Sequence, residues 1–284
     1  MRAMKISPRY DGPPLISIDG APDDQLAPVV RQRRRMETML AGLSDEQWRA
    51  PSRCDGWTVQ DVISHLNGVN TFWEASVRAG LSGTPTRMLD GFDPAATPAL
   101  MVAAVRTLEP NEVFDQFVAS NDGYLGVMAD LDADGWATLA EAPPGHIPIR
   151  LIASHALWDA WVHERDIALP LGIAPPVEPD EVLSSMRYAA ALSPAFKLTA
   201  AQPCRGSFVV EVIDLEAAFT LEVSESVAVH NGVTADDAPA LRGNGLPLVE
   251  TMSIRAPLDD AAPREWHELL GGLATVFDAP TSVG

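Results

Sequence analysis

The stretch HALWDAWVHERDI, residues 155–167, sets two histidines and two aspartates among bulky apolar residues. On a helix with 3.6 residues per turn, positions i, i+4, i+8 and i+11 lie within about 80° of one another. The titratable residues have this spacing and so share one helical face: His155, Asp159, His163 and Asp166. Two tryptophans and a valine between them make the helix apolar nearly all round. Such a helix is mostly buried, and its buried polar groups need partners.

A further histidine, His65, lies on the apolar stripe of another predicted helix. A lone histidine there is more often a core residue than a ligand. However, a carboxylate and a histidine at i, i+4 on the 155–167 helix can bind one ion, and His65 would supply a third ligand. Two imidazoles and a carboxylate match a zinc site with an open position, or the facial triad of Fe(II). The spacing leaves open whether the helix contributes His155 with Asp159 or Asp159 with His163, and His146 in the preceding loop is another candidate.

Helical patterns separated by irregular connections fill the first 170 residues, which predicts a bundle of about four long helices. The clearest start is Thr58, since Asp61 three residues later completes a capping box; this helix should run to about Arg78. Ser44 and Gln47 predict a second capping box on a short turn. Further helices are expected at residues 25–43, 97–108, 111–131 and 148–169, with a loop at 143–148.

The composition changes after residue 176. A helix is expected at 178–192, and the segments 207–213, 218–223 and 226–230 alternate or are β-branched, which is typical of strands. Asn231-Gly232 is a tight-turn signal, and a closing helix is expected at 266–277. The predicted organisation is an irregular lead-in at 1–24, a metal-binding four-helix bundle at 25–172 and a smaller α+β domain at 173–284.

The net charge is −19, from 20 Lys+Arg against 39 Asp+Glu. This acidity argues against a broad surface for nucleic acid or anionic membrane, because both are polyanions. The one basic cluster, residues 31–35, is expected to be a solvated helix face. Two cysteines make no disulfide framework, Cys54 is expected to be a small buried thiol, and no signal segment or membrane span is evident. We therefore expect a cytoplasmic protein with reduced thiols; its oligomeric state stays open.

Two segments resemble a known family. CDGWTVQDVISHL, residues 54–66, preceded by LSDEQW at 43–48, is similar to the N-terminal signature of mycothiol-dependent maleylpyruvate isomerases, within the DinB/YfiT-like metalloprotein superfamily. DAWVHERDIA, residues 159–168, resembles the family's second signature, on the last helix of a DinB-like bundle. The resemblance covers residues 25–170 well. The family's second domain, a smaller sterol-carrier-like α+β unit, matches 178–284 more loosely.

The resemblance assigns the metal ligands to His65, Asp159 and His163, and so selects between the pairs that the spacing left open. It places Asp166 beside the same site as a catalytic residue that orients a ligand histidine or moves a proton. The family usually has glutamate where this chain has Asp159. A basic residue of the second domain faces the substrate in the family, and the candidates here are Arg242 and Arg255.

The resemblance also implies a divalent metal, zinc in the first place, and mycothiol as the thiol co-substrate. The implied activity is a thiol-dependent isomerase or S-transferase acting on a small electrophile, with cis–trans isomerisation of maleylpyruvate as the family prototype. Two alternatives stay open. One is a non-catalytic, metal-dependent small-molecule-binding protein of the same fold, and the other is an Fe(II) oxygenase.

Overall fold

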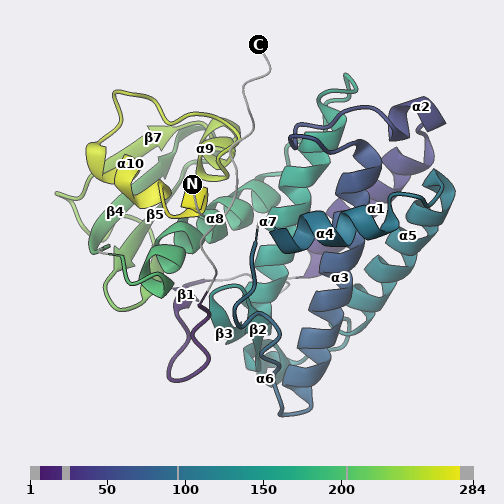
Figure 1. The fold of residues 1–284 in the computed structure, drawn as a ribbon. Coiled ribbons are helices and arrows are strands. Elements are labelled where there is room, and N and C mark those ends of the chain that lie inside the picture. Colours follow the sequence, from purple (N-terminus) through teal and green to yellow (C-terminus); the bar gives the residue numbers. More distant parts are fainter. Residues whose placement is uncertain (1–6, 21–25, 95, 203, 276–284) are drawn as a thin grey trace.

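We analysed a computed structural model of the chain, which describes residues 7–20, 26–94, 96–202 and 204–275. Helices form one side of the molecule and a β-sheet the other (Figure 1). On the helical side, four long helices pack against one another: α1 (Leu26–Ala41), α3 (Val59–Leu81), α5 (Pro110–Gly126) and α7 (Ile149–Ala168). Three shorter ones connect them: α2 (Asp45–Trp48), α4 (Ala96–Val105) and α6 (Ala133–Ala137).

The two predicted capping boxes are present. The Ser44 hydroxyl accepts from the backbone N–H of Gln47, whose side chain accepts from the N–H of Ser44. Thr58 and Asp61 make the equivalent pair at the start of α3. Each box satisfies two backbone N–H groups that a helix start leaves without partners, so both helices begin where the sequence predicted.

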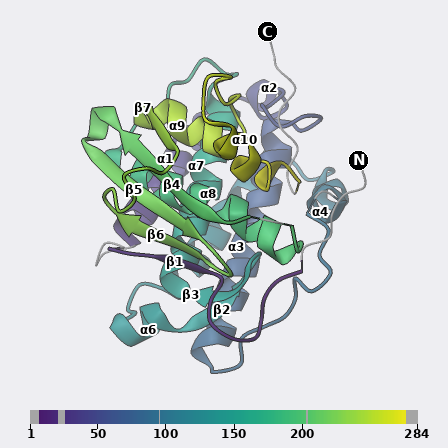
Figure 2. The same ribbon diagram turned by 90° about the vertical axis from the view of Figure 1, so that its left-hand side faces the viewer.

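The β-sheet has five strands in the order β1-β6-β5-β4-β7, and Figure 2 looks onto it with β1 and β7 at opposite edges. Its strands are β1 (Ile16–Ile18), β4 (Gly206–Val212), β5 (Ala217–Val223), β6 (Val227–Asn231) and β7 (Ala240–Gly243). The central strands are antiparallel and both edge strands pair in parallel. The remaining helices are α8 (Pro179–Thr199), α9 (Gly245–Met252) and α10 (Arg264–Leu270). Because α8 contacts both α7 and the sheet, it joins the two sides.

Several expectations need correction. Ile16–Ile18, expected to be irregular, pairs with Val227–Val229 of β6; a three-residue strand is too short to show a pattern. The expected loop at 143–148 is the end of a hairpin of β2 (Leu139–Ala142) and β3 (Gly145–Pro148). Helix α8 continues past its predicted end through Pro194, because the helix is buried on both sides there. The strand β7 and helix α9 were not predicted. The expectations for residues 1–6 and 21–25 (the irregular lead-in and the start of the first helix) and for 276–277 (the end of the closing helix) concern residues outside the described part of the chain.

The basic cluster of α1 is a solvated face only in part, since Arg31 and Arg34 are exposed. Gln32 and Arg33 are fully buried, and Arg35 donates to two buried carboxylates, Glu164 of α7 and Glu181 of α8, at 2.7 and 2.8 Å. The expectation failed for these residues because α1 packs against both α7 and α8, which supply the charges that compensate Arg35. Within the described residues, no helix is long and apolar enough to cross a membrane.

Candidate active site

Three of the predicted ligands converge where α3 faces α7. The ligand atoms of His65, Asp159 and His163 all lie within 4.8 Å of one another. His163 Nε2 is 3.6 Å from Asp159 Oδ1, and the two histidine rings are 5.1 Å apart between centroids. The i, i+4 spacing on α7 brings the carboxylate and imidazole together, and the packing of α3 on α7 adds the second imidazole.

The three residues fit a divalent ion. Asp159 Oδ2 is buried and has no hydrogen-bond partner among the described residues, so a carboxylate oxygen is available. Burial lowers the pKa of His65 to about 4, which keeps this imidazole in its neutral, coordinating form at pH 7. Burial would raise the pKa of Asp159, but the neighbouring histidines lower it overall, so the carboxylate is ionised. Two imidazoles and a carboxylate suit zinc or a similar first-row ion.

Asp166 lies behind His163, fully buried. Its Oδ2 is 3.0 Å from His163 Nδ1. An ionised carboxylate only accepts, so Nδ1 carries a hydrogen, and Nε2 faces Asp159 and presents a lone pair to a metal ion once it loses its proton. Burial would raise the pKa of Asp166, but the hydrogen bonds of His163 and Arg255 hold it well below its usual range. Burial would lower the pKa of His163, whereas Asp159 and Asp166 raise it to about 10. This geometry favours an orienting role for Asp166.

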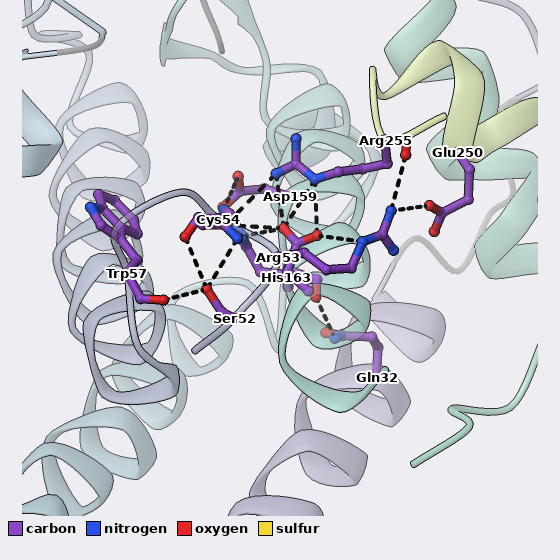
Figure 3. Close-up of polar contacts among 11 residues, drawn as sticks. Gln32, Ser52, Arg53, Cys54, Trp57, Asp159, His163, Glu250 and Arg255 are labelled. Carbon is purple, nitrogen blue, oxygen red and sulfur yellow. Dashed lines mark hydrogen bonds and ion pairs between the residues drawn. The ribbon is translucent and has the colours of Figure 1, made fainter. Parts of the chain in front are cut away.

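Arg255 and Cys54 complete the cluster around Asp166, and Figure 3 shows the polar contacts of both residues. Arg255 donates to Asp166 through Nε and Nη2 at 2.9 and 2.8 Å. The Cys54 thiol donates to Asp166 Oδ2 at 3.3 Å and lies 3.7 Å from His163 Nδ1. Cys54 is only half-buried and lines a cavity, so it is more than a packed thiol of the core. Its place at the head of the 54–66 signature was the available signal in the sequence.

The turn after α9 positions Arg255. Its N–H donates to Glu250 O at 2.8 Å, and the N–H of Ile254 donates to Thr251 O at 3.0 Å, which is a Schellman cap. Ile254 occupies the left-handed position of this cap, with φ of +54°, where glycine is usual. Arg242, the other candidate, is exposed on β7, pairs with Glu211 at 2.8 Å and does not line the cavity.

A cavity of about 580 Å³ opens beside the three ligands. Its wall is mainly apolar and includes Val69, Phe72, Trp73, Leu89, Phe92, Met101, Trp158, Val162 and Phe196. The metal-ligand candidates, Cys54, Arg53 and Arg255 form the polar part of the wall, and His155 lines it too. His146 lies elsewhere, with Nε2 bonded to Thr86 O at 2.8 Å. A pocket of this size and polarity suits a small organic ligand.

Comparison with known proteins gives a consistent result. Residues 29–168 match the mycothiol maleylpyruvate isomerase N-terminal domain. A crystal structure of the mycothiol-dependent maleylpyruvate isomerase is similar over 82% of this chain and 89% of that chain, with a TM-score of 0.59 and 15% identity. A mutant of that isomerase in which one histidine is replaced by alanine has the same coverage and identity and a TM-score of 0.58. At this identity the likeness concerns the fold.

No match was found among curated proteins. The domain match spans all three ligand candidates and the helices that carry them. Residues 29–168 therefore belong to the family of mycothiol maleylpyruvate isomerase N-terminal domains.

Proposed function

We propose that the protein is a metal-dependent enzyme that uses mycothiol, as an isomerase or S-transferase, on a small electrophilic substrate. The observation that carries the proposal is the convergence of His65, Asp159 and His163 at the wall of a cavity, with Asp159 Oδ2 buried and unpartnered within the described residues. The family of the domain supports the thiol as co-substrate.

In this proposal the three residues hold a divalent ion, zinc in the first place. When bound, the ion would supply a position at which a thiol is deprotonated at neutral pH. Asp166 keeps the Nε2 lone pair of His163 directed at the ion. The apolar wall excludes water, and Arg255 holds Asp166 in place through two hydrogen bonds from the second domain.

The thiolate of mycothiol would add to an electron-poor cis double bond, forming a C–S bond while the π electrons move onto the conjugated carbonyl. Rotation about the resulting single bond and expulsion of the thiolate give the trans isomer with no net change in atoms. A transferase would instead protonate the adduct and release it.

We also propose the domain organisation predicted from the sequence, with a metal-binding four-helix bundle at 25–172 and a sterol-carrier-like α+β domain at 173–284. The sheet of the second domain includes β1, so the N-terminal segment contributes a strand to it. Packing of α8 against both α7 and the sheet supports a close association of the two domains.

Metal analysis tests the ligand set. We expect about one equivalent of zinc per chain in the wild type, its loss in His65→Ala and His163→Ala, and its retention in His155→Ala. Circular dichroism should show that all three variants fold. Retention of zinc in the first two variants would contradict the assignment, and stoichiometric iron would point to the facial-triad oxygenase instead.

Activity is tested separately with the metal-loaded protein. We expect turnover of an activated alkene or epoxide, with maleylpyruvate tested beside them as the family prototype, only when mycothiol is present, and its loss in His163→Ala. Stoichiometric zinc without turnover of any of these substrates would favour the alternative, a metal-dependent small-molecule-binding protein.

A further inference from the structure

We propose that His155 and Tyr188 form a hydrogen-bond-donor subsite that selects a ligand with an apolar body and an uncharged oxygen acceptor, such as an aryl ketone or enone. The inference rests on the proposed function only in taking this ligand to be the electrophilic substrate. The subsite lies in the cavity of the metal-ligand candidates but uses none of their atoms.

His155 shares a helical face with Asp159, yet it does not join the converging ligands. Its Nδ1 is 2.8 Å from the hydroxyl of Tyr188, a residue of α8. Three aromatic rings surround the imidazole, with centroids 4.8 Å away for Trp73, 5.4 Å for Trp158 and 5.0 Å for Tyr188. An imidazole held in this way is set in orientation by residues of three helices.

The hydrogen bond also decides which nitrogen carries the hydrogen. Tyr188 is fully buried, and burial raises the pKa of its hydroxyl, so the phenol keeps its proton. Burial lowers the pKa of His155 to about 4, so the ring is neutral at pH 7. The buried Tyr188 hydroxyl has no other partner among the described residues, so its hydrogen is satisfied by donation to Nδ1, and Nε2 of the neutral imidazole then carries the hydrogen.

This Nε2–H is directed to the ligand space. Among the described residues Nε2 has no hydrogen-bond partner, and His155 lines the cavity. Because the donor has no protein partner, a ligand acceptor at this point is favoured over an apolar group, which would cover the donor without satisfying it. His155 precedes Asp159 by four residues, about 6 Å along the helix. The acceptor would thus lie a few bonds from an electrophilic carbon near the metal ligands.

The rest of the cavity disfavours a dicarboxylate. Its wall near His155 is aromatic, including Phe72, Trp73 and Phe196. Arg255 is already paired with the buried Asp166, and Arg53 with Glu250 at 2.7 Å, so both cations are compensated. Burying a second carboxylate against aromatic rings without a free cation carries a large desolvation cost. An uncharged carbonyl pays far less and finds its donor in His155.

Calorimetric titration of the zinc-loaded protein, without thiol, tests the subsite with acetophenone, ethylbenzene and maleate as probes. Acetophenone and ethylbenzene share the phenyl ring and the two side-chain carbons, but only acetophenone carries the oxygen acceptor. The affinity ratio of acetophenone to ethylbenzene should fall roughly 2- to 13-fold in His155→Phe, as expected for one net hydrogen bond, and should be kept in His155→Gln, which retains a donor. An unchanged ratio in His155→Phe would overturn the proposal, as would maleate binding more tightly than acetophenone.

A second measurement holds even where a His155 variant fails to fold. The ¹⁵N chemical shifts of His155 in the wild type should show hydrogen on Nε2 and none on Nδ1, and Tyr188→Phe should convert them to a tautomer mixture. Hydrogen on Nδ1 in the wild type would refute the arrangement. Neither measurement needs turnover. If the thiol assay fails but His155→Phe lowers the affinity ratio, the proposed function is contradicted and the subsite is supported. If the enzyme is active but the ratio is unchanged, only the subsite is contradicted.

Discussion

Replacing Arg255 with methionine should destabilise the folded protein by about 3 kcal/mol. Methionine keeps an apolar stem of similar length but removes the guanidinium that pairs with Asp166. The ion pair joins the turn after α9 to the C-terminal half of α7, so its loss weakens a contact between the two sides of the molecule.

The magnitude follows from burial. The side chain of Asp166 is 0% exposed and that of Arg255 is 12% exposed, with N–O distances of 2.9 and 2.8 Å. Removing one partner of such a pair costs about 3–5 kcal/mol, because the other charge stays buried without compensation. Asp166 keeps the hydrogen bonds of His163 and Cys54 and an ion pair with Arg53 at 3.7 Å, which places the expectation at the lower end of that range.

Urea unfolding at pH 7 is the assay, and Arg242→Met is the matched control. Arg242 also pairs with a carboxylate at 2.8 Å, but its side chain is 66% exposed, so its loss should cost only about 0–1 kcal/mol. A double-mutant cycle of Arg255→Met with Asp166→Asn should give a coupling of at least about 1.5 kcal/mol. Equal stability of the two arginine variants, or no coupling, would refute the reasoning.

The stabilisation by the Arg255–Asp166 ion pair should be lost at low pH. The folded pKa of Asp166 lies below its unfolded value of about 3.9, so the stabilisation is fully present above that value. It is lost as the pH falls through the folded pKa. The difference between wild type and Arg255→Met should therefore stay constant from pH 7 to about 5 and shrink below about 4.

Three further predictions concern the site and its rim. Because the pKa of His163 is about 10, zinc must displace a proton to bind. The apparent zinc affinity should therefore rise by up to tenfold per pH unit, roughly between pH 6 and 8. A zinc affinity that does not change with pH in a chelator competition would contradict this. Glu141 accepts from Tyr10, Thr86 and the N–H groups of Met88 and Leu89, at 2.6 to 2.8 Å, and so holds the cavity rim. Glu141→Gln should cost about 3 kcal/mol in urea unfolding, because an amide NH₂ cannot accept, while Glu74→Gln should cost little. At Ile254, glycine should be more stable than alanine by about 1 kcal/mol, since only glycine adopts φ of +54° without strain; thermal unfolding showing alanine ahead would contradict the assigned backbone strain.

Local patterns of the sequence determined the helical side well. The capping boxes at Ser44 and Thr58 and the spacing from His155 to Asp166 involve residues within three or four positions of one another. Such contacts form whenever the helix forms, so periodicity and cap chemistry are enough to predict them. The resemblance to a family then indicated which of the candidate ligands bind together, namely His65, Asp159 and His163.

Tertiary structure alone decided the surroundings of those ligands. Arg255 and Asp166 are 89 residues apart, and His155 and Tyr188 are 33 apart on different helices. β1 pairs with β6 from the other end of the chain, and Arg35 of α1 pairs with buried carboxylates of α7 and α8. No pattern within a single segment reports such partners, because a side chain's charge state and direction depend on whatever the fold packs against it. The helices and the candidate ligands could therefore be predicted from local sequence. The pairing of Arg255 with Asp166 and the orientation of the His155 donor arise only when distant segments pack together.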